Sequence, residues 1–126
     1  HIVRATLEAI AYQVKDVIQV IKASSQMDIT VLRADGGGSS NPFLMQFQAD
    51  ILGIPVEVPE IAETTALGVA YLAGLAVGFW DSQHELSGQW RLNARYEPRI
   101  PPVESDRLYS GWQRAMERAR DWEIPA

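Results

Sequence analysis

A glycine-rich stretch, "ADGGGSSNPF" over residues 34–43, holds the residues of this sequence that are best suited to contact an anionic ligand. Three consecutive glycines follow an apolar segment, and Asn41 and Pro42 open an amphipathic one. Glycine lets the main chain approach a ligand closely, and the free amides at a helix N-terminus favour phosphate. The stretch therefore has the composition of a phosphate-contacting turn between a strand and a helix.

The same stretch also fits a turn that holds no ligand, and the residues alone leave both interpretations open. Asn41 is a favoured N-cap and Pro42 a favoured first helical residue. A Walker A loop is excluded because no Lys-Ser or Lys-Thr pair follows the glycines. A dinucleotide-binding fingerprint is excluded because Asn41 stands where its third glycine belongs. An Asn41 side chain that caps the helix and one that points at a ligand are different predictions.

Composition narrows the function classes. The chain has 126 residues, 16 acidic and 11 basic, and no cysteine. The excess of acidic residues argues against a nucleic-acid partner, whose phosphates are negatively charged. The absence of cysteine excludes disulfides and thiolate chemistry. No basic-then-apolar leader is visible, so the cytoplasm is the expected location. The length predicts one domain at most, with enough chain to bury a core.

Alternating elements position the glycine loop. Apolar residues at helical spacing predict a helix over residues 2–22, and "ITVLRA" predicts a strand over residues 29–34 that is covered on both faces. A second helix follows the glycines and ends at Gly53, and "IPVEV" over residues 54–58 predicts another strand. The order of these elements predicts an α/β fold in which parallel strands are flanked by helices.

The rest of the chain is interpreted more coarsely. The run "ALGVAYLAGLAVGFW", residues 66–80, is shorter than the ~20 residues that a membrane helix needs, so we expect a helix buried on most sides rather than a membrane span. Residues 81–102 are rich in proline and predict a loop pinned by Trp90 and Tyr96. A final amphipathic helix is expected from Leu108 to Trp122.

Other candidate chemistry is sparse. Asp81, His84 and Glu85 lie close enough in sequence to share a metal ion, but a surface histidine beside acidic residues is the better interpretation. The residues predict neither a catalytic group nor a metal site in this chain.

A family resemblance bears on the glycine loop. The segment "ADGGGSSNPFLMQFQADILGIPVEVPEIAETTALGVAYLAGLAVGFW", with "ATLEAIAYQVKDV" before it and "GWQRAMERARDW" after it, is similar to the C-terminal domain of the FGGY carbohydrate kinases. Within that family it resembles the members that phosphorylate glycerol. The resemblance covers nearly the whole chain.

The resemblance implies a fold and an activity. The fold would be part of a ribonuclease-H-like domain of the actin, Hsp70 and sugar-kinase type. Residues 1–126 would form the C-terminal part of the second, nucleotide-binding domain, with the first domain absent. The parent enzyme would use ATP and Mg²⁺ to convert glycerol into sn-glycerol 3-phosphate, with ATP, ADP and glycerol as its partners.

The resemblance also assigns the glycine loop. By position, Gly37 and Asn41 match nucleotide contacts of the family, and Gly36 and Gly38 shape the loop. The sequence departs from the family at Gly38, often Ala, and at Pro42, often Asn or Asp. The family's catalytic carboxylate and glycerol-binding residues have no match here, so we expect the isolated chain to be inactive.

Two alternatives stay open beside this interpretation. One is a non-catalytic structural module that associates with itself through exposed strand edges and an uncovered apolar face. The other is the same domain of a sister sugar kinase such as xylulokinase, since the acceptor-binding residues are not in this chain. A homo-oligomer is expected for the parent enzyme.

Overall fold

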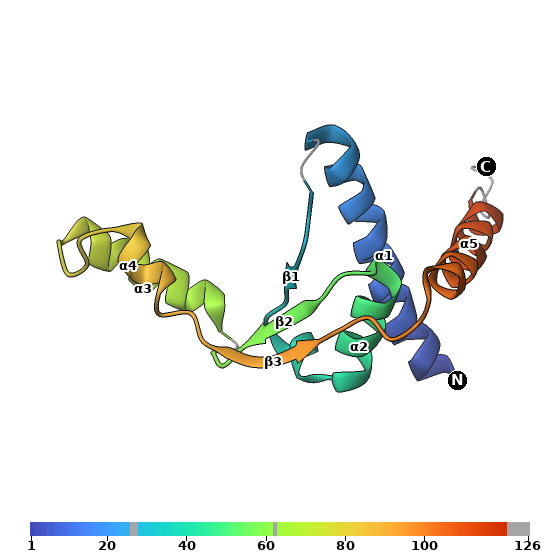
Figure 1. Cartoon of the computed structure of the whole chain (residues 1–126), viewed down its shortest axis with the longest axis horizontal. Helices are drawn as coiled ribbons and strands as arrows, with labels where there is room; N and C mark the ends of the chain where they lie inside the picture. Colours follow the sequence, from blue (N-terminus) through green and yellow to red (C-terminus); the bar gives the residue numbers. More distant parts are fainter. Residues whose placement is uncertain (26–27, 62, 121–126) are drawn as a thin grey trace, which may run out of the picture.

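The structure is a computed structural model that describes residues 1–25, 28–61 and 63–120. Its elements, in chain order, are α1 (Ile2–Ser25), β1 (Leu32–Arg33), the 3₁₀ turn η1 (Gly37–Ser40), α2 (Pro42–Leu52), β2 (Val56–Pro59), α3 (Thr64–Ala76), α4 (Gln83–Ser87), β3 (Leu92–Tyr96) and α5 (Pro102–Ala119). Figure 1 shows a small sheet in the middle, with α1, α2 and α5 on one side and an arm of α3 and α4 on the other.

Local sequence signals set the ends of α2. Pro42 is its first residue, and the Asn41 side-chain oxygen accepts a hydrogen bond from the Leu44 amide at 3.1 Å. Gly53 ends the helix with φ of 69°, a left-handed conformation that glycine adopts without strain. The predicted helix after the glycines is therefore confirmed.

The sheet has the order β1-β2-β3. β1 pairs in parallel with β2, Leu32 opposite Val56, which confirms the predicted parallel pairing. The predicted strand over residues 29–34 is reduced to two residues. Within the described sheet β1 pairs on one side only, so half of its main-chain groups have no strand to bond.

β3 corrects the prediction that residues 81–102 form a loop. It runs antiparallel to β2, with Val56 opposite Tyr96 and Glu57 opposite Arg95. The Glu57 carboxylate bridges Arg95 and also Arg33 of β1, the latter at 3.5 Å. Leu92, Ala94 and Tyr96 alternate with polar residues, and Ala94 and Tyr96 pack on the core, so a short strand pattern was present in the sequence but was outweighed by the nearby prolines.

The core forms around α2, which packs against α1, α5, β2 and β3. Tyr12 of α1 is its aromatic centre: its ring meets Phe47 edge-on at 5.5 Å and stacks on Trp112 of α5 at 5.5 Å. The predicted helix over residues 2–22 is confirmed and extends to Ser25. Its apolar stripe is covered only in part, because Val17 and Ile21 remain exposed.

Hydrogen bonds between α5 and α1 hold α5 in place. Asp16 of α1 accepts bonds from the Tyr109 hydroxyl and from the Trp112 indole nitrogen, the latter at 3.0 Å. Burial, with Asp16 adding to it, raises the pKa of Tyr109 to about 12. Lys15 lies 4.6 Å from the centre of the Tyr109 ring, and burial lowers its pKa. The final helix is confirmed as far as Ala119, and the predicted end at Trp122 lies outside the described residues.

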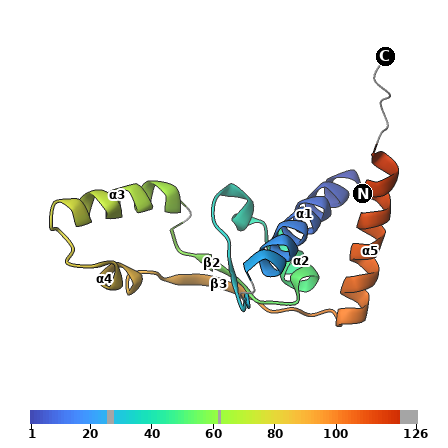
Figure 2. The ribbon, with the colours of Figure 1, turned by 90° about the horizontal axis from the view of Figure 1, so that it is seen from above.

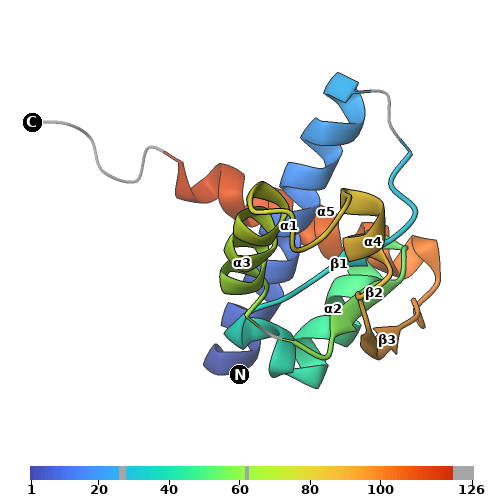
Figure 3. The ribbon, with the colours of Figure 1, turned by 90° about the vertical axis from the view of Figure 1, so that its left-hand side faces the viewer.

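α3 contradicts the expectation of a buried helix. It is not packed against any other described element as α2 is, and Gly74 is its one buried residue. Figure 2 shows α3 out on the arm, opposite the short α4 and beyond the β2–β3 ribbon, and Figure 3 shows the arm in front of the long α1 helix. Within the described residues, no helix is both long and apolar enough to cross a membrane.

Candidate functional site

The glycine loop connects the carboxyl end of β1 to the first turn of α2, and its shape depends on one glycine. Gly36 has φ of 77° and ψ of −177°, a backbone conformation that side-chain-bearing residues rarely adopt. The next turn is fixed by Ser39, whose main-chain amide and hydroxyl both donate to the Gly36 carbonyl, at 3.1 and 2.7 Å. Ser39 is buried, so these hydrogen bonds make the turn a well-packed part of the fold.

The main-chain amides of Gly37 and Gly38 are open. Both residues are exposed, and no described residue accepts a hydrogen bond from either amide. A Cβ added to Gly37 would meet nothing within 4 Å, and one added to Gly38 would meet only Leu44, at 3.8 Å. Two unpaired donors therefore lie on exposed residues at the start of a turn, as do the free amides that bind anions at helix N-termini.

Asn41 takes the capping role, and it does so with one atom. Its Oδ1 accepts the Leu44 amide, as an N-cap does. Among the described residues nothing bonds to its side-chain nitrogen. The sequence left open whether Asn41 caps the helix or contacts a ligand. In the structure the Asn41 oxygen caps α2, and the two donors of its side-chain nitrogen have no described partner.

The side chains beside the loop do not attract an anion, because the exposed Asp35 just before Gly36 is acidic. Arg33, the basic residue just before it, lies 3.5 Å from the Glu57 carboxylate and 4.2 Å from the centre of the Trp90 ring. An anion at the loop would be attracted chiefly by main-chain amides and by the dipole of α2.

The cavities lie elsewhere. One of about 450 Å³ is formed by α3, α4, the end of β2 and the residues just before β3, and Tyr71, Leu86 and Trp90 are among its lining residues. Another of about 390 Å³ lies between the first two turns of α1 and of α5 and one side of α2, and includes Phe43 and Arg107. Neither is lined by residues 36–41, so the glycine loop is an open surface in this chain.

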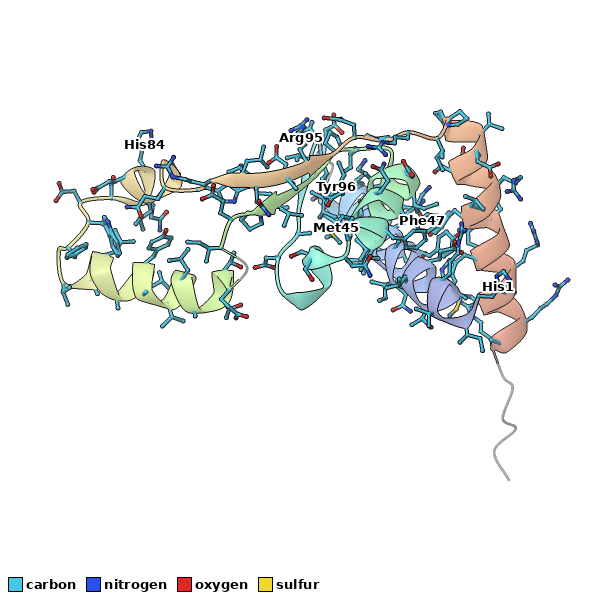
Figure 4. All side chains as sticks on the ribbon, turned by 90° about the horizontal axis from the view of Figure 1, so that it is seen from below. His1, Met45, Phe47, His84, Arg95 and Tyr96 are labelled. Atoms are coloured by element: carbon cyan, nitrogen blue, oxygen red, sulfur yellow. The ribbon has the colours of Figure 1, made fainter. Side chains whose placement is uncertain are left out.

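The remaining candidates are not brought together. His84 is exposed on α4, at the arm, far from Met45 and Phe47 of the core in Figure 4. The Glu85 carboxylate accepts the Asp81 amide at 3.0 Å, a local contact of the turn before α4. In the part of the chain that the structure describes, no group of three or more His, Cys, Asp or Glu residues could hold a metal ion.

One residue of the loop escaped the sequence analysis. Ser39 stands three positions after Gly36, and a serine at this spacing can bond back to the main chain of a turn. The spacing was a usable signal for a loop held by its own side chain.

Comparison with known proteins assigns the chain to a family. The sequence model of the FGGY family of carbohydrate kinases, C-terminal domain, matches residues 1–77. The chain belongs to this family. The resemblance on which the glycine-loop prediction rested is thereby confirmed, and so is the α/β fold class.

Curated members of the FGGY family show the same relation over nearly the whole chain. The glycerol kinase of Symbiobacterium thermophilum is 59% identical over 122 residues, which are 97% of this chain and 24% of that protein. Glycerol kinase 2 of Thermotoga maritima is 56% identical over 123 residues, or 98% of this chain and 25% of that protein. The chain thus spans about a quarter of the length of these relatives.

Solved structures of FGGY kinases share the fold. The Plasmodium falciparum glycerol kinase, solved with ADP, superposes with a TM-score of 0.83 at 36% identity, over 100% of this chain and 25% of that one. A xylulose kinase from Lactobacillus acidophilus superposes with a TM-score of 0.71 at 23% identity, over 92% of this chain and 24% of that one. The second likeness concerns the fold alone.

Proposed function

We propose that this chain is the C-terminal, nucleotide-binding portion of a glycerol kinase, which transfers the γ-phosphoryl group of ATP to glycerol and yields sn-glycerol 3-phosphate. The observation that carries the proposal is the pair of open amides at Gly37 and Gly38, in a chain 59% identical to a glycerol kinase. The glycerol kinase solved with ADP supports the nucleotide as the ligand.

The loop performs binding and orientation. The Gly37 and Gly38 amides and the Asn41 side-chain nitrogen donate hydrogen bonds to a phosphate or to the adenosine. Glycine at position 37 leaves room for the nucleotide to touch the main chain, and Gly36 gives the turn its direction. Because Ser39 and the Asn41 oxygen already fix the loop, little ordering is needed on binding.

The rest of phosphoryl transfer lies outside this chain in our proposal. Transfer needs a group that orients the acceptor hydroxyl and cations that neutralise the phosphates. The buried carboxylate of Asp50 is occupied by the Gln46 side chain at 3.0 Å and the Arg99 amide at 2.7 Å, so its role is structural. The described residues do not fit a Mg²⁺ site, and we assign no Mg²⁺ ligand here. The isolated chain is expected to be inactive with glycerol.

A chimeric enzyme tests the proposed function. The matching quarter of the Symbiobacterium thermophilum glycerol kinase is replaced by this chain, and ATP-dependent phosphorylation of glycerol is measured. We expect activity, and we expect Gly37→Ala to raise KM for ATP about tenfold, a loss of about 1.4 kcal/mol in binding. A methyl group at position 37 meets no neighbour within 4 Å, so the variant folds while filling the nucleotide's space.

The matched control is Gly111→Ala. Gly111 lies within α5, and a methyl group there meets only the end of the Arg114 side chain, at 4.0 Å. This variant should keep the KM of the unchanged chimera. An inactive chimera would contradict the proposed function, and equal KM values for the two variants would remove the nucleotide from the glycine loop.

A sister sugar kinase is the second candidate, and sequence identity argues against it. Curated glycerol kinases are 52–59% identical to this chain, against 23% for the xylulose kinase structure. Placing the chain in the Lactobacillus acidophilus xylulose kinase should therefore give no xylulose phosphorylation. Activity in that chimera and none in the glycerol kinase chimera would reverse the assignment.

A further inference from the structure

The three consecutive glycines of the loop have no side chains that could fix its direction. Glycine loses more main-chain freedom on folding than any other residue, so its conformation has to be held by other contacts. A Cβ built on Gly36 or Gly37 would have no neighbour within 4 Å, so packing does not confine these two positions. The restraints on the loop are therefore the hydrogen bonds to its main-chain carbonyls.

Two serines hold these carbonyls, each from three positions further along the chain. The Ser39 hydroxyl donates to the Gly36 carbonyl at 2.7 Å, and the Ser39 amide donates to the same oxygen at 3.1 Å. The Ser40 hydroxyl donates to the Gly37 carbonyl at 2.8 Å. Two successive carbonyls of the loop are thus each bonded to a serine hydroxyl.

Each of these carbonyls belongs to the same peptide unit as one of the open amides. The Gly36 carbonyl shares its unit with the Gly37 amide, and the Gly37 carbonyl shares its unit with the Gly38 amide. A peptide unit is planar, and in its trans form the C=O and the N–H point in opposite directions. No peptide bond in the described part of the chain is cis. A serine that holds the carbonyl therefore also sets the direction of the amide on the other side of the unit.

A hydrogen bond to the carbonyl also makes the amide of the same unit a stronger donor. Hydrogen bonds in a chain polarise one another, by roughly 10–30% per bond. The Gly36 carbonyl accepts two bonds from Ser39, so the Gly37 amide gains most. Ser39 is 6% exposed, and its hydroxyl acts through this peptide unit rather than at the surface.

We propose that Ser39 and Ser40 are positioning residues for the nucleotide. Each hydroxyl holds a carbonyl, and it thereby orients and polarises the amide of the same peptide unit, which donates to the nucleotide. Ser39 contributes more, because water does not reach a buried site to replace its hydroxyl, whereas Ser40 is exposed. This inference rests on the proposed function.

The test measures ADP binding by calorimetry in the chimera with the Symbiobacterium thermophilum glycerol kinase. Ser39→Ala should weaken ADP binding about fivefold and Ser40→Ala about twofold, because each loses one hydroxyl hydrogen bond that holds the loop. Ser40→Thr keeps a hydroxyl at an exposed position and should keep the affinity of the unchanged chimera.

Two serines elsewhere in the chain are matched controls. Ser105 is 5% exposed, and its hydroxyl donates to the Ile51 carbonyl at 3.1 Å. Ser87 is exposed, and its hydroxyl donates to the His84 carbonyl, three positions back, at 2.7 Å. Ser105→Ala and Ser87→Ala lose the same kinds of bond as the two loop variants, and both should leave the ADP affinity unchanged.

A second readout needs no nucleotide. The order parameter of the Gly37 amide is measured by ¹⁵N relaxation in the isolated chain. In Ser39→Ala it should fall by about 0.1 or more from the ~0.85 of a rigid backbone, because the peptide unit is then held by the Ser39 amide without the hydroxyl. In Ser105→Ala it should stay as in the unchanged chain.

The outcomes separate the two proposals. An inactive chimera that binds ADP, and binds it more weakly in Ser39→Ala than in Ser105→Ala, would support this inference and contradict the proposed function. A chimera that binds no ADP would contradict both. If Gly37→Ala weakens ADP binding while Ser39→Ala and Ser105→Ala have equal affinity, this inference alone is overturned. Weaker binding in Ser39→Ala with an unchanged Gly37 order parameter would also overturn it, because the hydroxyl would then not act by holding the loop.

Discussion

Two apolar helices of similar length, α2 and α3, have opposite surroundings. Seven of the 11 residues of α2 are buried, against one of the 13 in α3. α2 lies between α1, α5 and the sheet, whereas α3 extends along the arm, where the short α4 is the described helix near it (Figure 1). The difference shows that an apolar sequence does not by itself bury a helix, because burial also requires neighbouring elements that pack against it.

The position of the candidate site follows from this difference. The glycine loop is joined to α2, the best-packed helix, whose first turn is fixed by Asn41 and whose body is held by Phe47 and Ile51. A loop that donates hydrogen bonds to a nucleotide benefits from a rigid support. The arm, by contrast, carries an apolar helix whose outer face is exposed.

The largest effect should come from removing a ring in the packed region. Phe47→Ala deletes a side chain that is 8% exposed and in contact with Tyr12 and Phe43, and should lower the free energy of unfolding by about 3–5 kcal/mol. Phe79→Ala on the arm should change it by less than about 0.5 kcal/mol. Urea denaturation of both variants measures this, and equal losses would contradict the contrast between the two regions.

The next effect concerns the attachment of α5 to the packed region. Asp16→Ala leaves the Trp112 indole nitrogen without its acceptor and the Tyr109 hydroxyl with Gln19 Oε1 alone, at 3.0 Å, and should cost about 2–3 kcal/mol in the free energy of unfolding. Asp106→Ala is the control, because within the described residues the ion pair of this exposed carboxylate is with Lys15 alone, at 3.9 Å. Chemical denaturation that gave the control the larger loss would show that Asp16 does not hold α5.

The same contact predicts an alkaline loss of stability. Tyr109 has a pKa of about 12 in the folded chain against 10.0 for the free side chain, so the unfolded state releases its proton first. The contribution is fully present below pH 10 and is lost as the pH rises toward 12. Unfolding measured across this range should show the fall, and Tyr109→Phe should remove this part of it. An unchanged profile in Tyr109→Phe would refute the assignment.

The smallest effect is expected at the loop itself. Asn41→Ala removes the cap of α2 and should cost about 1 kcal/mol, whereas Asn41→Asp keeps the accepting oxygen and should cost almost nothing. In the chimera, both variants lose the donors of the side-chain nitrogen, so both should bind ADP more weakly. Calorimetry that found normal ADP affinity in Asn41→Asp would limit Asn41 to its capping role.

Local signals were sufficient for the helices around the site. The cap at Asn41, the proline at position 42 and the glycine at position 53 predicted α2 correctly, since each acts within one turn of the chain. The glycine loop was recognised as a compact turn for the same reason. Its binding role stays a prediction, because the ligand and the opposite side of the site are not in this chain.

Long-range contacts explain what the sequence did not predict. β3 was interpreted as a loop because its alternation covers only five residues and prolines follow it, whereas its pairing with β2, more than 30 positions earlier, is a long-range contact. The strand predicted over residues 29–34 is short because β1 has a described partner on one side only. The outer stripe of α1 is apolar yet exposed at Val17 and Ile21.

The sequence by itself determined where the helices α1, α2 and α5 form, where the loop turns and which family the chain resembles. These features depend on residues close together in the sequence and on short sequence motifs. Tertiary structure alone decided which apolar faces are buried, that β3 pairs with β2, and that the outer face of α3 stands uncovered. Burial is a property of pairs of surfaces, and a sequence pattern describes only one surface of each pair.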